Sequence, residues 1–359
     1  MTYNNTAVEN LSLLHNWISS IKLDIGLITD FSIQPIVGDA SLRKYYLLST
    51  KIINNSNNST QQQFIIMQTP IDNSMKNFIN IANFLSKLNL SINIPKIFAI
   101  KSTPPIGYLL LSYLGEKLLF KNLNFNNAES MYKVAWQAIA NIQLAAKDIN
   151  LPAMDRRYIK KNLILFKTWY LKTHLNLPNL FNINNLLNHL ENYFVKIFSE
   201  QPQVFVHIDY HSKNLILETQ STETNNSTSI GILDFQDAML GPITYDIASL
   251  LQDAYLVWPE DLTEKILFDY HAHVIKHNKQ CNLSQKQFLK YFYLTGLQRH
   301  IKNLGIFARL KYFYRKPDYL KHIPNLLNYI NKTCDKFPEP EILMLKNFLL
   351  NATCGIAEG

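Results

Sequence analysis

The densest group of potentially reactive side chains lies between residues 207 and 234. Asp209 is followed five positions later by Asn214 and, after 20 further positions, by Asp234. Phosphoryl transfer needs these residue types, because one carboxylate must orient a hydroxyl and accept its proton while a second carboxylate and an amide oxygen hold Mg²⁺ across nucleotide phosphates. The short apolar runs 215–217 and 230–233 predict a hairpin that returns Asp234 to the side of Asn214. The three oxygens can then converge on one spot.

Two further residues near this group have a supporting role in our interpretation. We expect His207 to brace the loop by hydrogen bonding rather than to shuttle protons. Asp246 lies in the first turn of a helix that follows Gly241-Pro242, where its charge complements the helix N-terminus. We therefore assign His207 and Asp246 to structural support of the reactive loop.

The first third of the chain reads as strands with one packed helix. After an opening helix at 8–24, short strands are expected at 31–37, 44–49, 64–67, 96–100 and 108–111, with a tight turn at 38–41. The polar stretch 51–63 is interpreted as a solvated hairpin loop. A helical stripe follows the third strand and consists of Phe78, Ile81, Ala82, Leu85 and Leu88.

From residue 116 helical patterns dominate, beginning with the stripe Met131, Ala135, Ala138, Ile142 and Ala145. A small β region interrupts them at 204–206, 215–217 and 230–233, and the polar stretch 218–229 is interpreted as a loop. Another amphipathic helix contains Ile247, Leu250, Leu251 and Ala254. The expected organisation is a β-rich part at 1–111, a linker at 112–115 and a helical part at 116–359.

Composition excludes a wholly disordered chain, because 47% of its 359 residues are hydrophobic. The net charge of +8 is compatible with anionic ligands and does not choose among them. Three widely spaced cysteines, without a CxxC pair, are interpreted as reduced thiols. The first residues lack a basic and apolar leader, and no apolar run reaches the ~18 residues of a membrane span. We expect a cytoplasmic protein that does not bind a membrane.

Over nearly its whole length the sequence resembles the aminoglycoside-phosphotransferase-like kinases, and within them the bacterial anomeric kinases for N-acetylmuramate and N-acetylglucosamine. The resemblance rests on three groups of segments, namely residues 38–45, residues 206–215 with 233–255, and the two α-helical segments 296–300 and 305–309. The reactive loop identifies only the superfamily. The segments Asp234-Phe-Gln-Asp-Ala238 and Gly296-Leu-Gln-Arg-His300 indicate the amino-sugar branch.

The resemblance implies an α+β, bilobal, protein-kinase-like fold with a small β-rich N-lobe and a larger, mostly helical C-lobe. It implies ATP as donor, Asp209 as catalytic base, and Asn214 and Asp234 as Mg²⁺ ligands. Nucleotide-binding residues are expected in the turn and in the linker: Gly38, Ala40 and Ser41 over the phosphates, and Leu111, Ser112 and Leu114 beside adenine.

The chain departs from the general kinase pattern in its phosphate-binding turn and in its positive charges. The turn Gly38-Asp-Ala-Ser41 contains one glycine, and Met67 stands about where a phosphate-pairing lysine is expected, with no obvious glutamate on the following helix. Either Arg43 or Lys44 supplies the charge or Mg²⁺ carries it largely alone, and only one of the two side chains can face the nucleotide. An equal alternative is that Arg43 and Lys44 are both solvated charges on the strand and do not contact the nucleotide.

For the acceptor, His211, Gln236 and Asp237 are adjacent to the catalytic carboxylates and can hydrogen-bond sugar hydroxyls. Arg299 and Arg309 are candidates for the lactyl carboxylate of N-acetylmuramate, because a guanidinium fork matches a carboxylate. Arginines paired within the helical lobe are the alternative. Tyr255 and Trp258 form either an apolar wall for the sugar or part of the core.

The leading hypothesis is an ATP-dependent kinase for the anomeric hydroxyl of these amino sugars in peptidoglycan recycling, with no obligate protein partner. A first alternative keeps the fold and changes the acceptor to an aminoglycoside or another small alcohol. A second is a non-catalytic basic binding protein. The scattered lysines and arginines argue against nucleic acid as its ligand.

Overall fold

The computed structural model describes residues 14–23, 26–36, 43–53, 59–88, 90, 92–177, 183–221, 226–279 and 281–357. The chain divides into two compact units. The first comprises Met1–Lys87 and Asn93–Gly115, and the second Leu88–Ile92 and Glu116–Gly359. Across the described residues, none of the helices is both long and apolar enough to cross a membrane. The turn residues Gly38, Ala40 and Ser41 lie outside the described residues.

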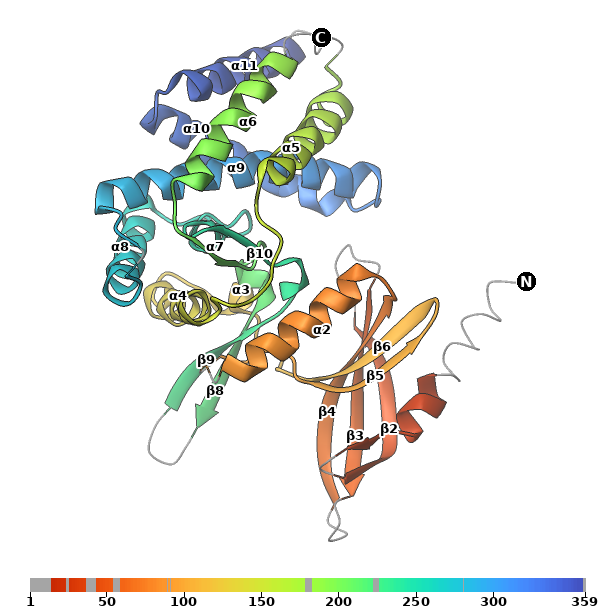
Figure 1. Cartoon of the computed structure of the whole chain (residues 1–359). Coiled ribbons are helices and arrows are strands. Elements are labelled where there is room, and N and C mark those ends of the chain that lie inside the picture. The colour runs from red at the N-terminus through yellow and green to blue at the C-terminus, as the bar shows by residue number, and fades with distance from the viewer. Residues whose placement is uncertain are drawn as a thin grey trace, which may run out of the picture. The chain divides into compact units, whose positions relative to one another are not determined.

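The first unit contains a six-stranded antiparallel sheet in the order β1-β2-β3-β4-β6-β5 (Figure 1). Its strands are β1 Lys22–Leu23, β2 Gly26–Ile36, β3 Lys44–Ile53, β4 Ser59–Pro70, β5 Ile97–Thr103 and β6 Ile106–Ser112. Helical turns at 14–19 contribute Leu14 and Ile18 to a core that includes Leu48, Phe64 and Leu110. Each of the five predicted strands overlaps one observed strand, from β2 to β6. The opening helix expected at 8–24 is helical only at 14–19 among its described residues, because Lys22–Leu23 form β1 instead.

The interpretation of residues 51–63 as a loop is wrong for its described residues, 51–53 and 59–63. β3 continues to Ile53 and β4 already begins at Ser59, and Lys51 pairs with Gln61 in the antiparallel register. The polar residues belong to a half-solvated sheet, where one face of a strand carries polar side chains while the other is buried. Ile52, which is buried opposite Ile28, belongs to that inner face.

Helix α2, Asn73–Leu85, follows β4. It starts at Asp72, whose side chain accepts a hydrogen bond from the Met75 N–H. The predicted stripe forms its buried face as far as Leu85, whereas Leu88 lies in a 3₁₀ turn and is half-buried. The linker after β6 ends at Gly115, whose φ of 100° favours glycine.

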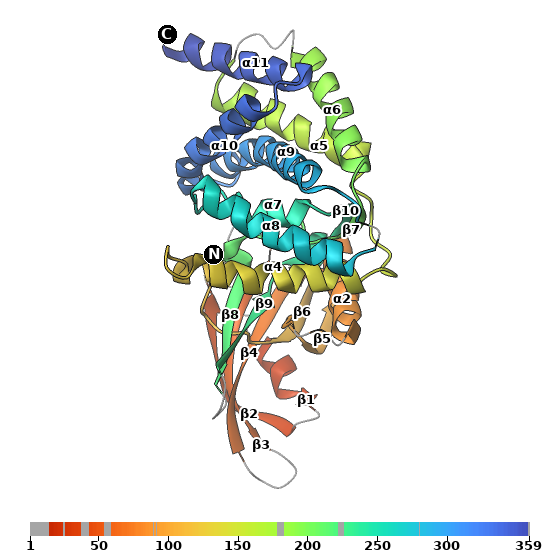
Figure 2. The same cartoon turned by 90° about the vertical axis from the view of Figure 1, so that its left-hand side faces the viewer.

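The second unit is mostly helical, with two small two-stranded sheets, β7–β10 and β8–β9. Figure 2 shows α8 alongside α4 and, beyond α7, the long helix α9, consistent with the contacts between these elements. The helices are α3 Leu119–Asn122, α4 Ala128–Ala145, α5 Arg156–Leu165, α6 Ile183–Ser199, α7 Tyr245–Leu251, α8 Glu260–His277, α9 Gln285–Tyr312, α10 Ile323–Lys336 and α11 Pro340–Ala357. The strands are β7 Gln203–Val206, β8 Leu215–Ser221, β9 Asn226–Ile232 and β10 Met239–Pro242.

Helix α9 is the central element of this unit. Its 28 residues span about 42 Å at 1.5 Å per residue, and a capping box between Ser284 and Gln287 fixes its start. It is buried on nearly all sides along residues 291–302. Polar residues in this stretch are therefore held inside the protein.

The α+β fold class is confirmed, with a β-rich first unit and a mostly helical second one. The interpretation of 218–229 as a loop is wrong for its described residues, because β8 extends to Ser221 and β9 begins at Asn226. Their ladder, which pairs Glu218 with Ser229, satisfies the backbone of these polar residues.

Candidate active site

The reactive loop connects β7 to β8 and has an unusual backbone. Ile208 has a φ of 81°, which is a genuine outlier for a β-branched residue. Asp246 on α7 stabilises this conformation, since its buried carboxylate accepts hydrogen bonds from the backbone N–H groups of His207, at 2.7 Å, and Ile208, at 3.2 Å. These contacts set the direction in which the next residue, Asp209, leaves the backbone.

A second buried carboxylate holds the far end of the loop. Asp253 accepts hydrogen bonds from the Ser212 N–H at 3.1 Å and the Ser212 hydroxyl at 2.6 Å. Its other oxygen accepts from the Tyr255 N–H at 2.9 Å. Sequence reasoning assigned no role to Asp253. Asp253 lies two residues beyond the end of α7, so helical spacing from Asp246 could not have identified it.

Hydrogen bonds join Asp209 to Asn214, and Asn214 to the residue that precedes Asp234. The Asn214 side-chain amide donates to the Asp209 carbonyl at 3.0 Å, and the Leu233 N–H donates to the Asn214 carbonyl at 3.0 Å. The β8–β9 register pairs Leu215 with Ile232, so Asp234 emerges next to Asn214. The predicted return of the hairpin to Asn214 is confirmed.

His207 joins the same set of hydrogen bonds from the other side. Its Nε2 lies 2.7 Å from the Leu233 carbonyl, which can only accept, so Nε2 carries the hydrogen. Burial lowers the pKa of His207 to about 4, although this hydrogen bond opposes the shift. The ring is therefore neutral near pH 7 and ties the loop to the residue before Asp234, as a bracing role requires.

The Asp209 carboxylate is about half exposed and faces a buried cation. The ammonium of Lys302 on α9 lies 3.8 Å from Asp209 Oδ1. Burial favours the neutral acid, but the positive charges of Lys302, His211 and Arg299 outweigh it and lower the pKa of Asp209. The carboxylate is thus ionised at neutral pH, as a proton acceptor must be. Sequence reasoning missed Lys302, although it follows Arg299 by three residues on one helix face.

The two predicted carboxylate-binding arginines occupy different surroundings on α9. Arg299 is buried, donates to the Ser249 hydroxyl at 2.5 Å and lies over the Tyr245 ring at 5.5 Å. Arg309 lies over the Tyr314 ring at 6.0 Å. The Nε atom of each has no hydrogen-bond partner among the described residues. Arg299 is thus anchored within the unit, and binding of an acceptor by either arginine stays a prediction.

The other predicted acceptor residues lie close to the reactive loop. His211 packs edge-on against Tyr255, with 5.4 Å between the rings. Gln236 is buried in the 3₁₀ turn after Asp234, donates to the exposed carboxylate of Asp237 at 3.3 Å, and leaves its own Oε1 without a partner among the described residues. A buried amide oxygen without a donor is suited to a ligand hydroxyl.

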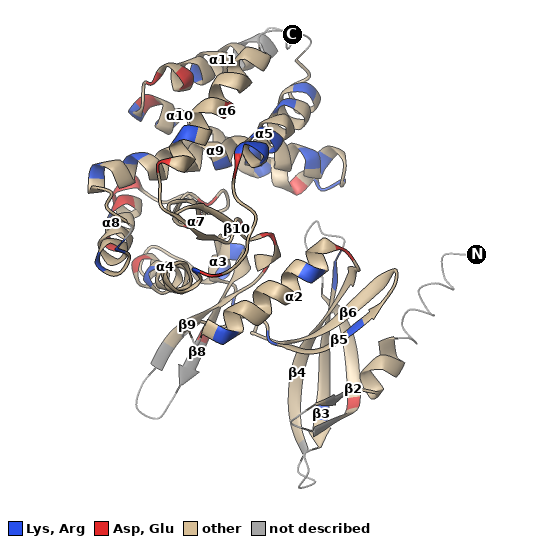
Figure 3. Cartoon of the chain, viewed as in Figure 1, with Lys and Arg blue, Asp and Glu red and all other residues tan. Residues whose placement is uncertain are grey.

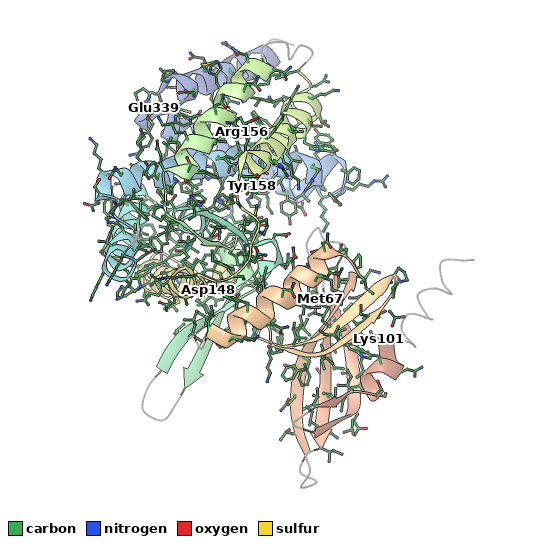
Figure 4. All side chains as sticks on the ribbon, viewed as in Figure 1. Met67, Lys101, Asp148, Arg156, Tyr158 and Glu339 are labelled. Atoms are coloured by element: carbon green, nitrogen blue, oxygen red, sulfur yellow. The ribbon has the colours of Figure 1, made fainter. Side chains whose placement is uncertain are left out.

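In the first unit, Arg43 is buried against α2, where it donates to the Ser74 hydroxyl at 2.6 Å, whereas Lys44 is exposed. Met67, labelled in Figure 4, is fully buried in the sheet. In the linker, the Ser112 N–H donates to the Lys96 carbonyl at 2.9 Å. That donor is therefore not available to adenine.

Asn214 and Asp234 supply a donor set that fits Mg²⁺, which prefers a few carboxylate and amide oxygens and keeps other positions for phosphates and water. The Asn214 amide nitrogen is engaged by the Asp209 carbonyl, which turns the amide oxygen away from it. Among the described residues no group of three or more His, Cys, Asp or Glu could hold a metal ion. A pair completed by nucleotide phosphates does not require such a group.

Comparison with known proteins adds the following similarities. The family model described as "Phosphotransferase enzyme family" matches residues 32–275. The N-acetylmuramate/N-acetylglucosamine kinase of Pseudomonas aeruginosa is 31% identical over 306 residues, which cover 85% of this chain and 84% of that protein. The protein of the same name from Neisseria meningitidis is 27% identical over 332 residues, or 91% of each chain.

Among solved structures, the gentamicin complex of APH(2")-IIa aligns with a TM-score of 0.53 and 15% identity, and covers 88% of this chain and 95% of that one. A ternary complex of APH(2")-IIa with streptomycin and ATP aligns with a TM-score of 0.51 and 14% identity. These likenesses concern the fold.

Proposed function

This chain belongs to the phosphotransferase enzyme family, and we propose that it transfers the γ-phosphoryl group of ATP to the anomeric hydroxyl of N-acetylmuramate and N-acetylglucosamine. The observation that carries the proposal is the 31% identity with a kinase of that name over 85% of the chain. The linked arrangement of Asp209, Asn214 and Asp234 supplies groups suited to this reaction. The sugar 1-phosphates would serve cell-wall precursor synthesis in the cytoplasm.

In the proposed reaction, the ionised carboxylate of Asp209 binds the acceptor hydroxyl and takes up its proton. The hydroxyl oxygen forms a bond to the γ-phosphorus as the bond between this phosphorus and the bridging oxygen of ATP breaks. The buried contacts of Asp246 and Asp253 hold the loop, so that little reorganisation is needed at the moment of transfer. Mg²⁺, held by Asn214 and Asp234, would neutralise charge on the nucleotide phosphates.

The nucleotide would be bound by the first unit and its linker. We assign the phosphates to Gly38, Ala40 and Ser41 with the guanidinium of Arg43, and adenine to the backbone of Leu111, Ser112 and Leu114. Because the Ser112 N–H is engaged within the sheet, Ser112 can contribute only its carbonyl.

For the acceptor, we assign His211, Gln236 and Asp237 to the sugar hydroxyls and Arg299 or Arg309 to the carboxylate of N-acetylmuramate. A polycationic acceptor is disfavoured next to the Lys302 ammonium, which lies 3.8 Å from Asp209. Basic and acidic residues occur together on α8 and α10 (Figure 3), whereas α9 carries lysines and arginines and no acidic residue. Because Arg299 and Lys302 of α9 are buried, this helix does not present the continuous basic stripe of a nucleic-acid-binding protein to solvent.

The proposal is tested by ³¹P NMR of the purified protein with Mg-ATP and, in separate samples, N-acetylmuramate, N-acetylglucosamine and kanamycin. We expect an anomeric sugar phosphate from each amino sugar and no product from kanamycin. The Asp209→Asn variant is the control for contaminating kinases, because it must lose the same signals. Product from kanamycin alone, or phosphate at a sugar hydroxyl other than C1, would contradict the proposal.

A further inference from the structure

Lys302 is a buried cation that the proposed reaction has not used. Its side chain is only 5% exposed, and its ammonium lies 3.2 Å from the hydroxyl of Tyr245. The Tyr245 hydroxyl lies 2.7 Å from that of Tyr158, which is labelled in Figure 4. Three elements of the second unit, α9, α7 and α5, therefore converge on this ammonium.

Asp209 Oδ1, at 3.8 Å, is the only carboxylate oxygen within 4 Å of the Lys302 ammonium in the described part of the chain. The separation is longer than a hydrogen bond but short enough for a favourable interaction between a buried ammonium and a half-exposed carboxylate. A buried ammonium is costly unless it is paired. The buried ammonium of Lys302 is therefore paired with the carboxylate of Asp209, to which the proposed function assigns proton transfer.

Two neighbouring cations are less suited to act on Asp209. The Arg299 guanidinium is anchored by the Ser249 hydroxyl and packs on the Tyr245 ring. Lys213 lies over the ring of Tyr255, 3.6 Å from its centre. In the described part of the chain no ion pair joins Arg299 to Asp209, whereas the Lys302 ammonium lies 3.8 Å from Asp209 Oδ1.

We propose that Lys302 is a positioning residue for phosphoryl transfer. Anchored by the Tyr158–Tyr245 hydroxyl pair, its ammonium attracts Oδ1 of Asp209 and so leaves the second carboxylate oxygen directed to the acceptor hydroxyl. The inference rests on the part of the proposed function that makes Asp209 the base, and not on the identity of the acceptor. The matched family model ends at residue 275, so Lys302 lies beyond it on α9.

The kinetic test uses Lys302→Met, which preserves most of the length and packing of the side chain and removes its charge. We expect kcat to fall roughly 10- to 100-fold, because a misplaced catalytic group costs about this much, while KM for ATP and acceptor stays within about threefold. Tyr245→Phe removes the hydrogen bond to the ammonium and should lower kcat in the same direction by a smaller factor. Lys311→Met, on the same helix with its ammonium over the Tyr312 ring, is the matched control and should retain wild-type kinetics.

A positioning role also predicts non-additivity, since Lys302 acts through Asp209. In an Asp209→Asn background, Lys302→Met should change kcat by less than about twofold. A full additional loss in that background, or a raised KM with unchanged kcat in the single variant, would overturn the proposal. These kinetic measurements use whichever acceptor the wild-type protein phosphorylates, so a wrong acceptor assignment does not affect the test.

Thermal unfolding provides a readout that requires no turnover. Asp209→Asn leaves the buried ammonium without its partner, and adding Lys302→Met removes that unpaired charge. If the two shifts were additive, the Tm of the double variant would equal the wild-type Tm plus both single-variant shifts. We expect the measured Tm to be higher than this value by roughly 2 °C or more. Additive Tm shifts would mean that Lys302 and Asp209 do not interact, and would overturn the proposal. Absence of turnover with every acceptor would instead contradict the proposed function.

Discussion

Replacing Asp246 with asparagine should reduce catalysis strongly without a matching loss of stability at neutral pH. The Asp246 carboxylate accepts the N–H groups of both His207 and Ile208, and Ile208 has a φ of 81°. An asparagine keeps one acceptor oxygen and turns an NH₂ group toward the other N–H. A backbone strained by about 1–3 kcal/mol can then relax and displace Asp209, so we expect kcat to fall about 100-fold.

The effect on stability has two opposing parts. Leaving one buried N–H without an acceptor costs about 1–3 kcal/mol. Burial, however, raises the pKa of Asp246 from 3.8 to about 7, although the two backbone hydrogen bonds oppose it. A shift of about three pKa units corresponds to about 4 kcal/mol by which the ionised carboxylate disfavours folding above pH 7. The neutral asparagine removes this penalty.

The sign of the pH dependence follows from proton binding. Between about pH 4 and pH 7 the folded protein keeps a proton on Asp246 that the unfolded chain has lost, so this residue makes stability fall as pH rises. His207 acts oppositely in the same window: its pKa is lowered to about 4, so its contribution is lost as pH falls from 6.5. Both proteins contain His207, and its contribution cancels in the difference between them.

The assay is urea unfolding of wild type and Asp246→Asn at pH 4.5 and pH 8, combined with kcat at pH 8. The stability of the variant relative to wild type should rise by about 3 kcal/mol from the lower to the higher pH, because part of the titration of the unfolded carboxyl is already complete at pH 4.5. Asp261→Asn, an exposed carboxylate on α8, is the control and should leave both quantities near wild type. Parallel stability curves, or a kcat that falls only in proportion to unfolding, would refute the reasoning.

Three further predictions concern the same unit. Asp209→Asn should lower kcat by about 10²–10⁴ with KM for ATP nearly unchanged, and wild-type turnover in steady-state assays would rule it out as the base. Ser212→Ala removes the 2.6 Å hydrogen bond to Asp253 and should cost about 1–3 kcal/mol in urea unfolding; a change below about 0.5 kcal/mol would contradict the buried bond. Gly305→Ala brings a Cβ within 2.5 Å of the Leu165 backbone, so it should destabilise by about 1–3 kcal/mol, in contrast to Asn303→Ala on the same helix. An unchanged Tm for Gly305→Ala would mean that α9 does not pack this closely.

The amino-acid sequence was informative wherever neighbouring residues decide the outcome. The stripe from Phe78 to Leu85 specifies the helix α2 because its spacing matches one helix face, and Asp72 provides its cap. The order Asp209, Asn214, Asp234 predicted their convergence, since two short strands in antiparallel pairing can only return Asp234 to Asn214. Polar composition misled the prediction for the described residues of 51–63 and 218–229, because strands at a solvated face carry polar side chains and still satisfy their backbone.

Only the tertiary structure decided what surrounds the reactive loop. Asp246, Asp253 and Lys302 act on this loop from 38 to 93 positions further along the chain. They come from the wholly buried α7, from the segment just after it and from α9. Burial gives these charges their effect, because a carboxylate or ammonium removed from water must find partners, and the partners are those that helix packing presents. Local sequence spacing determines which residues share a face, whereas packing between distant elements determines what that face contacts.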